Sequence, residues 1–130
     1  MTIKVLMIDS DETFCRNVSQ RLLMENYQVL VTADEATAKR IVYKEKVDVV
    51  LLGLKDLQHR GLSLLETIKK IRPATAVILM LSAEQLSLSI EGMRRGAFDD
   101  LLIPFKIETL LSRISAACQH TQQLKKRKRQ

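Results

Sequence analysis

The sequence predicts an α/β fold built on a doubly wound, five-stranded parallel sheet. Five short apolar runs alternate with longer segments of helical spacing. Two of these runs, VDVVLL and AVILML, are near-continuous in apolar residues, which is typical of strands buried on both faces of a parallel sheet. No repeat, low-complexity stretch or internal linker interrupts the 130 residues, a length that suits one domain. Strands that alternate with helices favour βαβ units.

The expected strands are short and rich in Val, Ile and Leu. They are IKVLMI (3–8), QVLVT (28–32), VDVVLL (47–52), AVILML (76–81) and DLLI (100–103).

Helical spacing predicts a helix after each strand. The first covers 11–25, and Asp34 caps a second helix that runs to about 45. The third covers 62–71 and ends before Pro73, because the residue that precedes a proline disfavours helix.

Ser82 is expected to cap the fourth helix, which ends at Gly96. The fifth helix starts near Ile107 and runs on toward the basic end of the chain. The side chains expected to face the sheet are Phe14, Val18, Leu22, Leu23, Ala38, Ile41, Val42, Leu64, Leu65, Ile68, Ile71, Leu86, Ile90, Met93, Ile107, Leu110, Leu111 and Ile114.

The positive charge is concentrated in a tail. Five cations lie in 125–129, and subtracting them from the net charge of +6 leaves +1 for the rest of the chain. We therefore divide the chain into a domain at 1–120 and a basic tail or start of a linker at 121–130. Such a run is either a solvated helix end or a weak, electrostatic contact to phosphate backbones or acidic surfaces. Its cations are Lys125, Lys126, Arg127, Lys128 and Arg129.

The remaining composition is typical of a cytoplasmic protein. Cys15 and Cys118 stand far apart without CxxC spacing, which suggests a reducing compartment. No apolar run approaches the ~20 residues that span a bilayer, and the start MTIKVLMID does not resemble a signal peptide. We therefore expect no membrane insertion.

A site in such a sheet is expected beyond the carboxyl ends of the strands, where the strand order reverses. No glycine-rich phosphate loop and no GxSxG motif follows a strand, and neither His59 nor His120 stands at a strand end. An independent enzyme is therefore not expected. What remains is the acidic group formed by Asp9, Asp11 and Glu12 after the first strand.

Carboxylates at a strand end can hold Mg²⁺, but the ion needs several oxygen ligands in octahedral geometry. A second carboxylate is expected from the central strand, 47–52. That strand ends instead in Gly53, which has no side chain.

These residues resemble a bacterial response-regulator receiver domain, a flavodoxin-like (βα)₅ module of two-component phosphorelay systems. The resemblance covers roughly 3–119 and includes IDSDE, VDVVLLGLKDLQHRGLSLLETIKKIRP, LMLSAE and GMRRGAFDDLLIPF.

In that family, an aspartate after the third strand accepts a phosphoryl group from a histidine kinase, and two acids after the first strand hold Mg²⁺. A Ser or Thr after the fourth strand and a Lys after the fifth contact the phosphate, and an aromatic residue near the fifth strand acts as a switch. By position, the resemblance places Asp9 at the first acid, Ser10 (followed by Asp11) at the second acid, and Gly53 at the acceptor. It places Ser82 at the hydroxyl position and Asp100 at the position of the aromatic residue. The position of the lysine is taken by Ile103, which is followed by the expected Pro104.

The resemblance therefore implies a degenerate, or pseudo-, receiver domain. Glycine offers no nucleophile at position 53, and Asp9 is a weak remnant of the metal site, so no cofactor and at most weak Mg²⁺ binding are expected. Removing one partner of a buried charged pair can cost ~3–5 kcal/mol, whereas an apolar replacement of the whole set is often neutral. Ile103 is consistent with such a replacement.

Three functions stay open. The first is a signalling module that acts by contact with a protein, which can be an effector domain, a kinase or a second copy. The second is a phospho-switch that uses another acid such as Asp56, which we expect to lack an activating lysine. The third is nucleic-acid binding, either weakly through the tail or through an effector domain outside this sequence. The expected contact surface has mixed charge and comprises Arg94, Arg95, Asp99, Asp100, Glu108 and Arg113.

Overall fold

The computed structural model describes residues 2–129 and confirms the predicted fold class. Five parallel strands form one sheet in the order β2-β1-β3-β4-β5. The elements are β1 (Lys4–Ile8), α1 (Glu12–Met24), β2 (Gln28–Thr32), α2 (Glu35–Lys44), β3 (Val49–Gly53), α3 (His59–Ile71), β4 (Ala76–Leu81), the short 3₁₀ turn η1 (Ala83–Gln85), α4 (Leu86–Arg94), β5 (Asp99–Leu102) and α5 (Ile107–Arg129).

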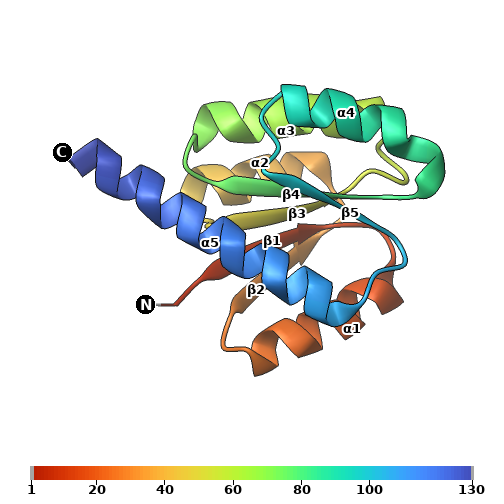
Figure 1. The fold of residues 1–130 in the computed structure, drawn as a ribbon, viewed down its shortest axis with the longest axis horizontal. Coiled ribbons are helices and arrows are strands. Elements are labelled where there is room, and N and C mark those ends of the chain that lie inside the picture. Colours follow the sequence, from red (N-terminus) through yellow and green to blue (C-terminus); the bar gives the residue numbers. More distant parts are fainter. Residues whose placement is uncertain (1, 130) are drawn as a thin grey trace.

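Helices cover both faces of the sheet (Figure 1). Val5 and Met7 of β1 pack toward α1 and α5, whereas Leu6 and Ile8 pack toward α2 and α3. The same alternation runs through β3 and β4, whose residues are all buried. The three central strands β1, β3 and β4 therefore have two buried faces, as expected, whereas the edge strands β2 and β5 are largely partly buried or exposed.

The topology brings the ends of β1 and β3 together. β1 pairs with β2 on one side and β3 on the other, and Ile8 is level with Thr32 and with Leu52. The chain order reverses about β1, so the residues after β1 and β3 meet where such folds place their sites.

Helix ends follow the expected local chemistry. The side chain of Asp11 accepts a hydrogen bond from the Phe14 N–H (3.0 Å), and that of Asp34 accepts one from the Thr37 N–H (2.9 Å). Gly96 follows α4 with φ of +109°, a backbone conformation that favours glycine.

The prediction of buried helix faces was wrong for four side chains. These are Leu23 (57% exposed), Leu86 (50%), Ile90 (61%) and Met93 (43%).

The three on α4 face outward because another face of the helix packs against the core. The buried residues of α4 are Leu88, Ser89 and Gly92. A Cβ on Gly92 would lie 2.4 Å from Cδ1 of Leu79 and 3.3 Å from Cδ2 of Leu62. The glycine thus lets the helix backbone approach the sheet closely, while Leu86, Ile90 and Met93 remain on the outside.

The basic tail is helical and continues α5 without a break to Arg129. The predicted division between 120 and 121 falls inside this helix, whose end projects past the sheet in Figure 1. Within residues 2–129, no helix has the length and apolar character required to cross a membrane.

Candidate functional site

A small hollow of about 30 Å³ lies beyond the carboxyl ends of β1 and β3. It brings together Asp9, Ser10 and Gly53, as the resemblance implies. Asp11, Ser82, Ile103 and Pro104 do not line it. The lining residues are Ile8, Asp9, Ser10, Ala33, Gly53, Lys55, Asp56 and Leu57.

The side chain of Asp9 occupies the space beside Gly53. A Cβ added to Gly53 would lie 2.3 Å from Oδ2 of Asp9, 3.1 Å from its Cγ and 3.2 Å from the carbonyl oxygen of Ile8. Gly53 has no positive φ that would require glycine. Glycine at 53 is therefore explained by the nearby Asp9 carboxylate, which leaves little room for a side chain. The backbone conformation does not require glycine at this position.

Asp9 is half-buried, and most of its surroundings disfavour the charged form of its carboxyl. Burial raises the pKa of its carboxyl above the usual 3.8, and the negative charges of Asp11 and Asp56 raise the pKa further. The Asp11 N–H, which donates to Oδ1 of Asp9 at 2.9 Å, and the cation of Lys55 act in the opposite direction.

These residues fit Mg²⁺ poorly. The carboxylate of Asp11 caps α1, one oxygen of Asp9 accepts a backbone N–H, and the acceptor position is Gly53. Among residues 2–129, no three His, Cys, Asp or Glu side chains are grouped to hold a metal ion. An octahedral ion would need several further oxygen ligands here.

Two features of the hollow were missed from the sequence. The Ser10 hydroxyl donates a hydrogen bond to Oδ2 of Asp56, so the acid in the loop after β3 reaches the position of the second acid. Lys55 lines the same hollow. Lys55 and Asp56 are both exposed. The adjacent Lys-Asp pair in the sequence was the available signal.

Ser82 serves the local structure at the end of β4. Its N–H donates to Oε1 of Gln85 (3.2 Å), and Nε2 of Gln85 donates to the carbonyl of Leu54 (2.8 Å). Gln85 therefore ties the end of β4 to the chain just after β3, and it was not foreseen from the sequence.

The positions after β5 and within it carry neither the lysine nor the aromatic residue that the resemblance led us to look for. Ile103 is partly buried and packs against the α1 and α5 side of the core, while Pro104 follows through a cis peptide bond. Asp100, at the aromatic position, accepts a hydrogen bond from the hydroxyl of Ser89 on α4. A polar contact thus joins β5 to α4 where the family carries its switch residue.

The predicted mixed-charge surface pairs largely within the chain. Arg113 donates a hydrogen bond to the carbonyl oxygen of Asp100 (3.1 Å). Glu108 is exposed. The ion pairs are Arg94–Glu91 (3.9 Å), Arg95–Glu66 (2.7 Å), Arg95–Glu91 (3.1 Å) and Arg113–Asp99 (2.9 Å).

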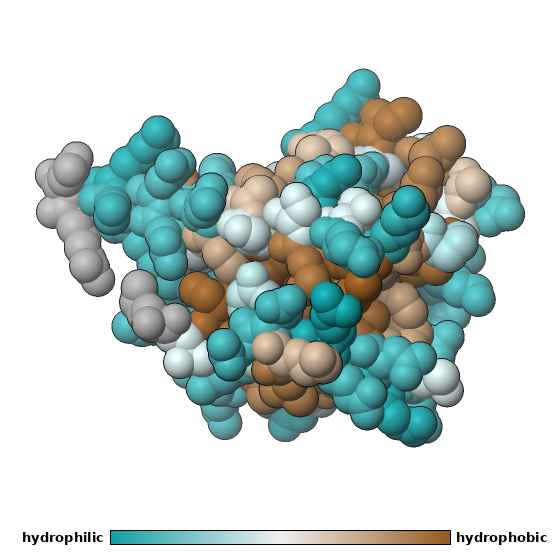
Figure 2. Space-filling model, turned by 60° about the horizontal axis from the view of Figure 1, so that its bottom comes forward, coloured by the Kyte–Doolittle hydropathy of each residue, from teal (hydrophilic) through white to brown (hydrophobic). Residues whose placement is uncertain are grey.

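The most prominent exposed feature near this surface is apolar. Leu86, Ile90 and Met93 form a stripe along α4, and Leu102 of β5 is 47% exposed. Figure 2 shows hydrophobic residues gathered at the upper right, at the end of the molecule where α4 lies in Figure 1. The projecting end of α5, at the left, is hydrophilic.

The sheet order and the hollow at β1 and β3 define a flavodoxin-like α/β domain. Comparison with known families gives a match to the response regulator receiver domain over residues 5–115. The chain therefore belongs to the response regulator receiver domain family.

Relatives and solved structures agree with this family. The transcriptional regulatory protein ZraR of Escherichia coli is 26% identical over 119 residues, which cover 92% of this chain and 27% of that protein. The DNA-binding transcriptional regulator NtrC of Azospirillum brasilense is 29% identical over 113 residues, covering 87% of this chain and 24% of that one. The chain thus spans about a quarter of these relatives. A receiver domain of Clostridium thermocellum superposes with a TM-score of 0.87 at 30% identity, covering 94% and 98% of the two chains.

Proposed function

We propose that this chain is a degenerate receiver domain, one that no longer accepts a phosphoryl group at the strand end and signals by contact with another protein. The observation that carries the proposal is the pairing of Gly53 with the Asp9 carboxylate, which fills the space of an acceptor side chain. Without a carboxylate at 53 there is no nucleophile to attack a phosphoryl donor. The domain acts as a binding module without catalytic activity of its own.

The other positions support the same proposal. Ile103 packs into the core instead of presenting a cation, and Asp11 is committed to capping α1. Mg²⁺ binding is correspondingly lost or weak. The several changes make a coherent set, which favours natural divergence over a single substitution at Gly53. We place the domain in the cytoplasm, consistent with the free thiols of Cys15 and Cys118.

Phosphorylation is tested by incubation with acetyl phosphate and Mg²⁺, followed by intact mass measurement. We expect no added phosphoryl group on the chain. The competing function is a phospho-switch at Asp56, favoured by its contact with Ser10 and by Lys55 in the same hollow. One phosphoryl group that is added to the chain and absent from Asp56→Asn would replace our proposal with this alternative.

For the contact surface, we favour the apolar stripe of Leu86, Ile90 and Met93 with Leu102, and a second copy of this chain as its occupant. The neighbouring charged residues Arg95 and Arg113 already form ion pairs within the chain, so a partner that binds the stripe is expected to be apolar. The same stripe of a second copy, related by a two-fold axis, meets that requirement. An effector domain or a kinase is the alternative occupant.

Sedimentation at high micromolar concentration distinguishes these occupants. We expect a dimer that Ile90→Lys converts to monomer, because a buried unpaired charge is costly. Tyr43→Lys is the matched control, since Tyr43 is an exposed apolar side chain (73%) on α2. A monomer at all concentrations would contradict the choice of a second copy.

The named relatives are transcriptional regulators. By analogy, this chain can be the receiver part of a DNA-binding regulator whose effector domain lies outside the sequence. Direct nucleic-acid binding would be weak and salt-dependent, since it would rest on the tail cations alone.

A further inference from the structure

A second polar cluster lies at the amino ends of the strands, away from the hollow, and centres on Asp48. The residue is 8% exposed and directly precedes β3. Its carboxylate accepts hydrogen bonds from the Lys4 N–H (2.9 Å) and from Nζ of Lys125 (3.0 Å). Its carbonyl accepts from the Ala76 N–H (3.1 Å) and from Oγ1 of Thr121 (3.1 Å). Asp48 thus joins β1, β3 and β4 to α5.

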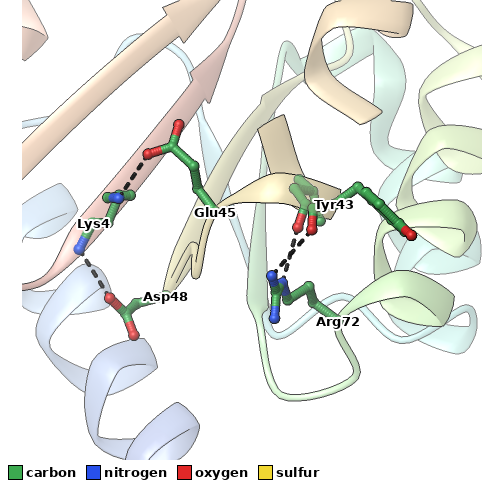
Figure 3. A network of polar contacts seen from close by, with 6 residues as sticks. Lys4, Tyr43, Glu45, Asp48 and Arg72 are labelled. Carbon is green, nitrogen blue, oxygen red and sulfur yellow. Dashed lines mark hydrogen bonds and ion pairs between the residues drawn. The ribbon is translucent and has the colours of Figure 1, made fainter. Parts of the chain in front are cut away.

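The side chain of Lys4 does not compete with Lys125 for this carboxylate. Nζ of Lys4 pairs with Glu45 at 2.8 Å, while its backbone N–H reaches Asp48 (Figure 3). Lys125 is therefore the side-chain cation that pairs with Asp48.

The contacts from α5 come from one face of the helix. Thr121 and Lys125 are four residues apart, so they lie on the same side. Thr121 is 1% exposed and continues the buried stripe of Leu110, Ile114 and Ala117. The packed face of α5 thus extends beyond the predicted end of the domain at residue 120.

The other end of α5 is tied to β5. Nη1 of Arg113 donates to Oδ2 of Asp99 (2.9 Å) and to the carbonyl oxygen of Asp100 (3.1 Å). The helix therefore has polar ties at two separated points, one near the edge strand β5 and one at the base of β3. Its 23 residues span about 35 Å at 1.5 Å per residue.

We propose that Asp48 anchors α5 as one rigid arm, and that the Thr121 and Lys125 contacts set the direction of its basic end relative to the sheet. The exposed cations Lys126, Arg127 and Lys128 are then held at a fixed place, instead of on a flexible tail. This inference concerns the connection through α5 and does not depend on whether the strand-end hollow accepts phosphate.

Hydrogen–deuterium exchange of the full chain tests the anchor. In Thr121→Val combined with Lys125→Ala, amides in 119–129 are expected to exchange about tenfold faster, because two of the ties that hold this segment are lost. Amides of β1, β3 and β4 are expected to keep their rates. Lys125→Ala alone is expected to give a smaller acceleration of about threefold.

Lys126→Ala is the matched control. It removes the same charge one residue away, from an exposed side chain. Alanine has the higher helix propensity, so the change by itself slows exchange or leaves it unchanged. The proposal would be overturned if amides in 119–129 exchanged at the same rate in the double variant as in Lys126→Ala. So would equal acceleration throughout the sheet, since the cluster would then serve global stability and not the arm.

Discussion

The two ends of the sheet surround their carboxylates differently. At the amino end, Asp48 has backbone and side-chain donors for both of its carboxylate oxygens and lies in a closed cluster. At the carboxyl end, Asp9 is half-buried near two other acids, and its pKa is raised. The same residue type is therefore fully paired at the amino end of the sheet, and lies among like charges at the carboxyl end.

The largest expected effect is at the amino end. Asp48→Ala leaves the Lys4 N–H and the Lys125 ammonium without their acceptor, so we expect the free energy of unfolding to fall by about 2–4 kcal/mol. Asp56→Ala, at the exposed edge of the hollow, is expected to change it by less than about 0.5 kcal/mol. Urea denaturation measures both. Equal losses in the two variants would remove the distinction between the two ends.

Placing an aspartate at position 53 is expected to have the next largest effect on the free energy of unfolding. Gly53→Asp displaces the Asp9 side chain and places two carboxylates together, so the free energy of unfolding should fall by about 1–3 kcal/mol at neutral pH. Gly53→Ala requires only that the end of the Asp9 side chain shifts, and should cost less than about 1 kcal/mol. A Gly53→Asp variant as stable as the parent would show that the hollow still accommodates an acceptor.

A smaller change in stability, and one of opposite sign, is expected from neutralising Asp9. Its carboxyl has a pKa raised above 3.8, mainly by burial, so the folded state holds the proton more tightly than the unfolded chain. Charged Asp9 therefore lowers stability above its folded pKa, and this penalty fades as the pH falls toward 3.8.

Asp9→Asn removes the charge and keeps an oxygen for the Asp11 N–H. The gain should be less than about 1 kcal/mol at neutral pH, because the group is half-exposed and solvent screens its charge. Urea unfolding near pH 7 and near pH 4 should give a larger gain at the higher pH. A gain that is the same at both would contradict the charge-based account.

Most of the fold follows from local patterns that tertiary packing did not override. The apolar runs predicted all five strands, and the cap at Asp34 predicted where α2 begins. Apolar spacing failed on α4, because the close approach at Gly92 places the face of Leu88, Ser89 and Gly92 inward. Helical periodicity ranks residues by hydrophobicity and does not detect a close contact made by glycine.

The candidate site was predictable to a similar extent. The meeting of Asp9, Ser10 and Gly53 follows from parallel topology alone. The contacts of Lys55 and Asp56 depend on the path of the loop after β3, which no periodic pattern specifies. Asp48 was visible as the one acid inside the run VDVVLL, but its partners Thr121 and Lys125 lie more than 70 residues away in the sequence.

The central claim is that the strand-end hollow no longer binds a phosphoryl group with Mg²⁺. The most direct measurement is a titration of the chain with Mg²⁺ and beryllofluoride, a phosphoryl analogue, followed by amide NMR shifts. Our account predicts no saturable shifts at Asp9, Ser10, Gly53 or Ser82. Saturable shifts at these residues that require both components would contradict it.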